Sequence, residues 1–328
     1  MNRLVTVIGG SGFVGTNFCK LLADKQIPFE IVDLKVSRRF PEKTKLGDVR
    51  DIASLRETVS GDVVVNLAAV HRDDVTDKSE YHRTNVLGAE NIAQVCREKQ
   101  IGKVVFTSSV AVYGFAEPGT DESGAIKPFN EYGRTKYAAE EIFRSWQEDT
   151  GNSLIIIRST VIFGPGNRGN VYNLLNQIAS GRFVMIGNGA NKKSMAYIDN
   201  VVDFLEACLT ETSDYTVYNY IDEPNLSMQD LVTEVRQRLK RGKGTGARIP
   251  YVLGLLLGYI ADIIAKITGR KLPVSSLRVR KFCASSEFRS TRQPSNFQPR
   301  HSLKEAVRRT VDAEFLNPDP DREIFYTE

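Results

Sequence analysis

Leu4-Val5-Thr6-Val7-Ile8-Gly9-Gly10-Ser11-Gly12-Phe13-Val14-Gly15 is the stretch that decides the fold of this chain. Its first five residues form a strand, and a helical spacing of apolar residues runs from Thr16 to Asp24. Gly9 permits a tight turn between them, Gly12 lets backbone amides approach a pyrophosphate, and Gly15 lets the helix pack on the strand. The helix N-terminus then faces the phosphate charge. The stretch therefore predicts a dinucleotide-binding strand–turn–helix unit.

An acidic residue ends the next strand-like run, which spans residues 29–33. Asp33 stands 18 positions after Gly15, where a carboxylate accepts hydrogen bonds from the adenosine ribose and repels a 2′-phosphate. This placement favours NAD over NADP as the cofactor. Arg38 and Arg39 lie slightly downstream and weaken this preference for NAD a little. The alternative is that both arginines belong to a solvated loop.

Short apolar runs alternate with helical stretches through the first half of the chain. The runs cover residues 4–8, 29–33, 46–48, 62–67, 103–107 and 153–158. Strands that are apolar on both faces suit a parallel sheet covered by helices on both sides, so we expect a doubly wound α/β (Rossmann) fold. After about Gly164 the alternation stops. We expect a nucleotide-binding domain over 1–165 and a smaller, mainly helical substrate region over 166–328, with the chain crossing between them and a surface tail at its end.

The composition excludes several classes of protein. The chain has 328 residues, 41% of them hydrophobic and 26% charged, which is typical of a globular protein. A net charge of +4 is too small to indicate nucleic-acid binding. The four cysteines show no C-x-x-C spacing, which argues against a metal site or a disulfide framework. With no secretory signal at the start, we expect a cytoplasmic protein.

One apolar segment, residues 249–261, needs a separate interpretation. Asp262 ends it well short of the roughly 20 residues that a membrane span requires. We favour a buried or interface helix, and a shallow membrane contact is the alternative.

A tyrosine and a lysine stand four residues apart in Tyr132-Gly133-Arg134-Thr135-Lys136, on one face of a helix. A free tyrosine has a pKa near 10 and is a weak base at neutral pH. The lysine and a positively charged nicotinamide ring would lower that pKa. The spacing alone is common, but Thr107-Ser108-Ser109 ends a predicted strand, where doubly wound folds bind ligands. Together these residues predict a catalytic site.

Several motifs occur in the order seen in one family: Val7 to Gly15, Asp33, Gly47-Asp48-Val49, Asn66 to Ala69, Ser108 to Gly114, Tyr132 to Lys136 and Arg158 to Pro165. On these motifs the chain resembles the NAD-dependent epimerase/dehydratase family of extended short-chain dehydrogenase/reductases. It is most similar there to UDP-galactose 4-epimerases and sugar-nucleotide reductases. The resemblance covers the chain to about Asp203.

The resemblance implies residue roles. Tyr132 would be the general base and acid, Lys136 would hold the nicotinamide ribose, and Ser109 would bond the reacting sugar oxygen. Residues implied to contact NAD, besides Tyr132 and Lys136, are Gly9, Gly12, Phe13, Val14, Gly15, Asp33, Asp48, Val49, Leu67, Ala68, Ala69, Asn85 and Thr107. A homodimer through helices of the first domain is also implied.

The reaction is narrowed by a departure from the family pattern. Dehydratases of the family usually carry an Asp-Glu pair just beyond the catalytic hydroxyl, whereas this chain has Val110-Ala111, whose side chains cannot transfer protons. This leaves 4-epimerisation of a UDP-hexose or UDP-N-acetylhexosamine, or NAD(P)-dependent reduction of a 4-keto sugar nucleotide. A hydroxysteroid-like alcohol dehydrogenase at a membrane surface and a non-catalytic NAD-sensing module are more distant alternatives, and the module would normally lack the Tyr/Lys pair.

The expected substrate is a nucleotide-diphosphate sugar. Candidate contacts are His71, Ser109, Asn170, Lys193, Arg278 and Arg280. Residues 270–310 hold eleven Lys/Arg against two Glu, and Arg278, Arg280 and Lys281 lie close together in the sequence there, as a diphosphate clamp requires. A solvated face, or a patch for acidic lipid beside residues 249–261, is the alternative for this basic stretch. Lys193 stands where 4-epimerases often place an arginine, so its phosphate contact would be a point charge.

Overall fold

A seven-stranded parallel sheet forms the centre of the computed structural model, which describes residues 3–72, 75–269 and 275–327. The strand order is β11-β6-β5-β4-β1-β2-β3. The strands are β1 (Val5–Ile8), β2 (Phe29–Asp33), β3 (Thr44–Leu46), β4 (Val63–Asn66), β5 (Lys103–Ser109), β6 (Ser153–Ser159) and β11 (Tyr215–Tyr220). The order reverses between β1 and β4, and ligands bind at such switch points. The predicted doubly wound α/β fold is confirmed.

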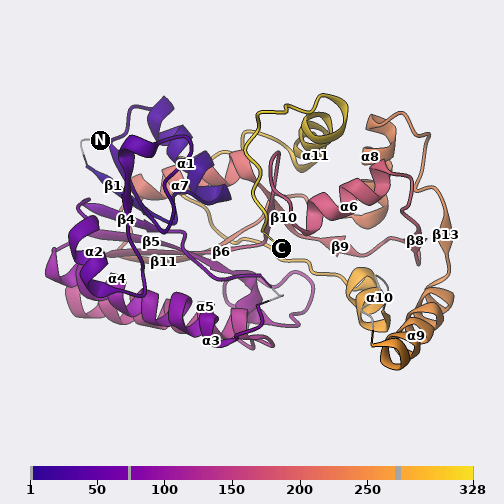
Figure 1. Cartoon of the computed structure of the whole chain (residues 1–328), viewed down its shortest axis with the longest axis horizontal. Helices are drawn as coiled ribbons and strands as arrows, with labels where there is room; N and C mark the ends of the chain where they lie inside the picture. The colour runs from indigo at the N-terminus through magenta and orange to yellow at the C-terminus, as the bar shows by residue number, and fades with distance from the viewer. Residues whose placement is uncertain (1–2, 73–74, 270–274, 328) are drawn as a thin grey trace.

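Helices cover both faces of this sheet (Figure 1). α1 (Phe13–Asp24) packs against α7 (Ile198–Thr210) on one face. The other face carries α2 (Ile52–Thr58), α4 (Gly88–Glu98) and α5 (Glu131–Thr150). Val7 enters the first core and its neighbour Ile8 enters the second. Successive strand residues are thus buried on opposite faces, which explains why the strands are apolar throughout.

The second region contains mostly helices and short strand pairs. Its elements are β7 (Val161–Phe163), α6 (Asn170–Ala179), β8 (Met185–Ile186), β9 (Lys192–Lys193), β10 (Met195–Tyr197), β12 (Leu226–Ser227), α8 (Met228–Arg238), β13 (Arg248–Ile249), α9 (Tyr251–Thr268), α10 (Ser276–Cys283) and α11 (Leu303–Val311). The other short elements of the described chain are α3 (Ser79–Tyr81), the 3₁₀ helices η1 (Pro41–Lys43) and η3 (Val110–Tyr113), and the π-helical segments η2 (His82–Leu87) and η4 (Asp312–Leu316). α7 and β11 return to the large sheet, so the chain crosses between the two regions.

Residues 317–321 are exposed, as expected of a surface tail, whereas the residues around Phe325 are bound to the body of the protein. The Phe325 amide donates to the Gly166 carbonyl at 2.9 Å, and the Arg168 amide donates to the Phe325 carbonyl at 2.8 Å. The Phe325 ring lies 5.7 Å from the ring of Phe13, centroid to centroid. The tail therefore closes against the first turn of α1, next to the glycine turn.

Helix α9 differs most from the sequence-based interpretation. It continues past Asp262 to Thr268, and only Gly254 and Gly258 are buried along it. The favoured buried helix is therefore wrong within this chain. In the part of the chain that the structure describes, α9 alone has the length and apolar composition to cross a membrane. Figure 1 places α9 and α10 at the end of the molecule away from the sheet.

Candidate active site

The glycine turn has the close approaches that its sequence predicts. Gly9 has φ +80°, and a Cβ there would lie 2.7 Å from the Ala68 amide nitrogen. A Cβ at Gly15 would lie 2.4 Å from the Gly9 carbonyl oxygen, so only glycine lets α1 approach the turn. At Gly12, the N-terminal cap of α1, the nearest atom to such a Cβ is 3.4 Å away. The space above Gly12 and the helix N-terminus is thus open to an anionic group.

Asp33 lies at the same turn. Its Oδ2 accepts a hydrogen bond from the Ser11 amide at 2.9 Å, and its Oδ1 accepts one from the Lys35 amide at 3.2 Å. The carboxylate is therefore fixed beside the phosphate-facing turn, where an adenosine ribose would present its hydroxyls. These groups fit a dinucleotide without a 2′-phosphate.

The expected adenine contacts follow β3. The Asp48 carboxylate pairs with the Arg50 guanidinium at 2.7 Å, and this arginine lowers the pKa of Asp48. Val49 is buried, and its carbonyl accepts a hydrogen bond from the Asn91 side chain at 2.8 Å. Asp48 is thus held by a neighbour, so its role toward adenine stays a prediction.

Asn85 links the segment after β4 to the catalytic helix. Its Oδ1 accepts from the Val70 amide at 2.9 Å, while its Nδ2 donates to the Val70 carbonyl and to Thr135 Oγ1, both at 3.0 Å. Thr107 similarly donates to the Asn66 carbonyl at 2.9 Å. These side chains hold the backbone of Leu67, Ala68 and Ala69 in place behind the cofactor site.

The three predicted catalytic residues lie near the carboxyl end of β5. Ser109 is its last residue, and Tyr132 lies in the first turn of α5, which Asn130 caps by accepting from the Gly133 amide at 2.9 Å. The Ser109 hydroxyl hydrogen bonds to the Tyr132 phenol. The structure therefore brings Ser109, Tyr132 and Lys136 together, as the sequence predicts.

The protonation of this pair differs from the sequence-based expectation. Burial raises the pKa of the Tyr132 phenol, and its hydrogen bond with Ser109 opposes this. Burial lowers the pKa of Lys136 to about 7, with the charge of Glu140 acting in the opposite direction. The Lys136 Nζ lies 4.2 Å from the centroid of the Phe106 ring. Of the two groups expected to lower the pKa of Tyr132, the lysine and the nicotinamide ring, the positively charged ring is therefore the main one.

A buried polar network behind α5 was missed by the sequence analysis. Arg158 and Glu140 form an ion pair at 2.7 Å, with side chains only 8% and 3% exposed. Arg158 also donates to the Tyr113 hydroxyl at 2.8 Å, and that hydroxyl donates to Asn219 at 2.8 Å. Ser108 donates to the same Glu140 carboxylate. The available signal was the spacing of four that continues from Tyr132 through Lys136 to Glu140 on one helix face.

His71 lies just beyond β4, near Lys136 and the C-terminal tail. Its ring hydrogen bonds with the backbones of Ala69 and Thr327. Partial burial lowers the pKa of His71, and the charges of Lys136 and Arg72 add to this effect, although the residue keeps an exposed surface. Its position beside Lys136 is compatible with the expected sugar pocket.

The remaining substrate candidates are more scattered. Asn170 is the exposed first residue of α6. The Lys193 ammonium donates to the carbonyls of Lys281 and Ala284 at 2.9 and 2.6 Å, so it caps the end of α10. Arg278 and Arg280 are two residues apart on α10 and point to different sides of that helix, and Arg280 donates to the Tyr259 hydroxyl. Lys281, three residues after Arg278, lies on the same side of this helix as Arg278, and the clamp of the three residues stays a prediction.

The chain is similar to known proteins both in sequence and in fold. The model of the NAD dependent epimerase/dehydratase family matches residues 5–220. The chain is 46% identical, over 100% of both chains, to an N-acetyl-alpha-D-glucosaminyl-diphospho-ditrans,octacis-undecaprenol 4-epimerase of Escherichia coli O157:H7. It is 24% identical to a UDP-glucose 4-epimerase of Vibrio cholerae, over 95% of this chain and 96% of the relative. The fold of a UDP-glucose 4-epimerase from Thermotoga maritima matches with a TM-score of 0.74 at 19% identity, covering 94% of this chain and 97% of the other.

Gly12 and Gly15, at the start of α1, should affect different properties: Gly15 the stability of the fold, and Gly12 the binding of the cofactor. We expect Gly15→Ala to destabilise the protein by about 1–3 kcal/mol, since the added methyl collides with the Gly9 carbonyl. We expect Gly12→Ala to keep the melting temperature but to weaken NAD binding about tenfold or more, because its methyl would stand between the amides and the pyrophosphate. Thermal melting and NAD titration measure both effects. Equal loss of stability in the two variants would contradict this division of roles.

Tyr132→Phe should lower kcat by about 10²–10⁴-fold, because the proton of the reacting hydroxyl then has no acceptor. The free energy of unfolding should fall by no more than about 0.5–1.5 kcal/mol, because the variant loses only the hydrogen bond with Ser109. Tyr137→Phe removes a hydroxyl from the same helix and serves as the control, with near-normal turnover expected. Retention of full turnover by Tyr132→Phe would exclude the tyrosine as the proton carrier.

Glu140→Gln should destabilise the protein by about 3–5 kcal/mol, because Arg158 stays buried without its counter-charge. The neighbouring Glu141→Gln is the matched control. It breaks a pair with Arg144 whose side chains are 44% and 37% exposed, so less than about 1 kcal/mol should be lost. Urea denaturation of both variants measures the difference. Similar denaturation midpoints would show that the buried ion pair contributes no more to stability than the exposed pair.

Proposed function

Because the chain belongs to the NAD dependent epimerase/dehydratase family, we propose that it is a 4-epimerase whose substrate is N-acetylglucosamine joined through a diphosphate to a polyprenol. The expected class, an NAD-dependent sugar-nucleotide 4-epimerase, agrees with the relatives. The proposal differs from the UDP-sugar expectation only in the group on the far side of the diphosphate. That group is a lipid in place of a nucleoside.

The observation that carries this proposal is the 46% identity to the undecaprenol-linked epimerase over the full length of both chains. The UDP-glucose 4-epimerase of Vibrio cholerae is also matched along nearly its whole length, but at 24% identity. The substrate region, residues 166–328, lies inside the match at the higher identity. The exposed apolar helix α9 is a second feature that suits a lipid-linked substrate.

Ser109 at the end of β5, with Tyr132 and Lys136 on α5, can carry out the proton transfers that epimerisation requires. Bound NAD supplies a reversible hydride acceptor for C4 of the sugar. Tyr132 would take the proton of the sugar's C4 hydroxyl and would return it to the same oxygen once the configuration at C4 has been inverted. Ser109 bonds that oxygen, and Lys136 holds the ribose side of the site. The substrate ends neither oxidised nor reduced.

A 4-keto reductase would use the same residues but would release oxidised cofactor in every cycle. Val110 and Ala111 follow Ser109 in η3, so no acid–base pair for dehydration stands next to it. The retained Tyr132 and Lys136 argue against a non-catalytic NAD-sensing module. A cytoplasmic location, where NAD is supplied, and a homodimer through helices of the first domain remain predictions.

Purified protein without added NAD should convert polyprenyl-diphospho-N-acetylglucosamine to the N-acetylgalactosamine epimer, detected by mass spectrometry and sugar chromatography after mild acid release. UDP-N-acetylglucosamine, tested in parallel, should be converted more than about tenfold less efficiently, because an enzyme built for the lipid loses those contacts. Tyr132→Phe is the inactive control for both substrates.

The outcomes separate the alternatives. Efficient conversion of the UDP-sugar with none of the lipid-linked sugar would overturn the lipid assignment and leave a UDP-sugar 4-epimerase. Turnover only with NADH and a 4-keto sugar would overturn epimerisation in favour of the reductase.

A further inference from the structure

Helix α9 has its small residues facing the protein and its large apolar residues facing outward. Gly254 lies against the side chain of Ile186, and Gly258 lies against the backbone of Ser276. Ala261 and Ala265 continue this half-buried stripe at helical spacing. Outward stand, among others, Val252, Ile263 and Ile267, which are 76%, 59% and 79% exposed. This is the reverse of a soluble surface helix, which turns its large apolar residues toward the core.

The exposed apolar surface is concentrated on this one element. Of the 21 large hydrophobic residues that are exposed in the described parts of the chain, ten lie on α9: Tyr251, Val252, Leu253, Leu256, Leu257, Tyr259, Ile260, Ile263, Ile264 and Ile267. Leu277 of α10, 59% exposed, adds to them. A contiguous patch of this kind marks an interaction site.

The stretch of sequence that contains α9 is strongly basic. Residues 239–284 contain ten Lys/Arg and a single acidic residue, Asp262, whereas the whole chain has a net charge of only +4. The rest of the chain is therefore net negative. Asp262 accepts a hydrogen bond from the Ser276 amide at 3.1 Å, so its carboxylate is used at the start of α10. An apolar face with a basic surround is complementary to a membrane with anionic headgroups.

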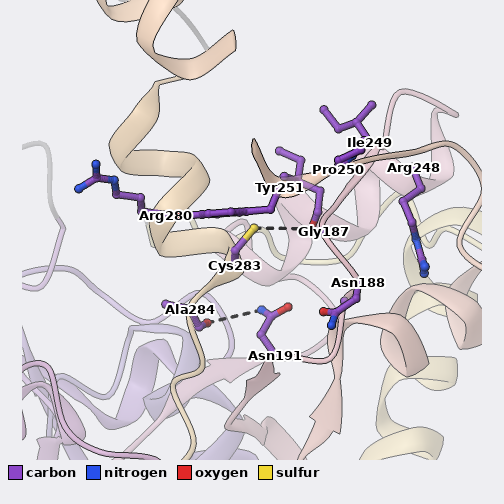
Figure 2. Close-up of a pocket in the computed structure, with 12 residues that line it drawn as sticks. Gly187, Asn188, Asn191, Arg248, Ile249, Pro250, Tyr251, Arg280, Cys283 and Ala284 are labelled. Atoms are coloured by element: carbon purple, nitrogen blue, oxygen red, sulfur yellow. Dashed lines mark hydrogen bonds between the residues drawn. The ribbon is translucent and has the colours of Figure 1, made fainter. Parts of the chain in front are cut away.

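The hairpin of α9 and α10 is suited to lie on a membrane, not to cross it. An 18-residue helix is about 27 Å long, slightly less than the ~30 Å hydrocarbon core. Both ends of the hairpin are tied to the protein: β13, just before α9, pairs with β8, and the Cys283 thiol at the end of α10 bonds to the Ile186 carbonyl at 3.5 Å. Residues of β8, β13, α9 and α10 line a hollow of about 880 Å³, and Figure 2 shows how these lining residues lie.

The hairpin also connects to the catalytic residues. Lys281 of α10 lies 5.8 Å from the ring of Phe129, three residues before Tyr132. Beyond α10 the chain returns to Phe288, whose ring stacks on Tyr113 at 5.8 Å, close to the end of β5. A membrane under α9 would thus lie at a fixed distance from the catalytic tyrosine.

We propose that the α9–α10 hairpin is an in-plane membrane anchor that seats the enzyme on an anionic lipid bilayer. The proposal rests on the proposed function for its purpose, because a polyprenol-linked sugar is delivered in the membrane. The outer face of α9 enters the boundary between headgroups and acyl chains, and the basic residues around it contact lipid phosphates.

Vesicle flotation tests the anchor directly. The full-length protein should float with vesicles of phosphatidylcholine containing phosphatidylglycerol, and less with phosphatidylcholine alone or at high salt. A double variant, Leu256→Glu with Ile263→Glu, should bind at least about tenfold more weakly, since two charges would enter the interface. The matched control, Tyr215→Glu with Leu316→Glu, changes two residues that are 42% and 43% exposed elsewhere and should float normally. Far-UV circular dichroism and melting should confirm that both variants are folded.

Activity assays separate failure of the anchor from failure of the proposed function. The α9 variant should keep turnover of a short-chain, water-soluble polyprenyl-diphospho-sugar and lose it, at least about tenfold, on a long-chain substrate in vesicles. Equal turnover of the vesicle substrate by wild type and variant would overturn the anchor but leave the function intact. Flotation together with turnover of UDP-sugars alone would overturn the function and support the anchor. Failure to float, with α9-dependent dimers in light scattering, would show that a second copy covers the helix.

Discussion

The active site depends on one close contact between α5 and the turn after β5. A Cβ on Gly133 would lie 2.5 Å from the Ala111 carbonyl oxygen, so only glycine lets the first turn of α5 approach η3 this closely. Tyr132 is the residue before this glycine, and Ser109 lies two residues before Ala111. The contact therefore sets the hydrogen bond between the serine and the tyrosine. The buried Arg158–Glu140 pair fixes the same helix two turns further on, from β6.

The electrostatics of the site follow from this packing. Bringing α5 onto the sheet buries Lys136, which lowers the pKa of its ammonium to about 7. Glu140 is one turn away but is already bound to Arg158 and Ser108. This buried carboxylate thus has a structural role, and Lys136 lies in an apolar setting against the Phe106 ring. A positively charged cofactor that enters such a site would lower the pKa values of both Tyr132 and Lys136.

The sequence predicted those parts of the protein that depend on local spacing. Glycines 9, 12 and 15 gave the turn, Asp33 gave the acid beside it, and the i, i+4 pair gave the catalytic helix, because each pattern is contained in one short segment. Arg158 and Glu140 meet from elements 18 residues apart, and no local pattern reports such a pairing. The clamp of Arg278, Arg280 and Lys281 stays a prediction, because residues two apart on a helix diverge and only Arg278 and Lys281, three apart, share a face of α10.

The packing of helix α9 is the opposite of what its apolar composition suggests. Its apolar sequence suggested burial, because in a soluble protein large apolar side chains gain roughly 1.5–3 kcal/mol each when they leave water. The structure instead buries the glycines and exposes ten large side chains, so most of that free energy is not obtained within this chain. A helix with small residues on both faces would pack on the protein equally well. The outward leucines and isoleucines therefore contribute little to folding, and their stabilisation must come from a second surface that meets the helix from outside.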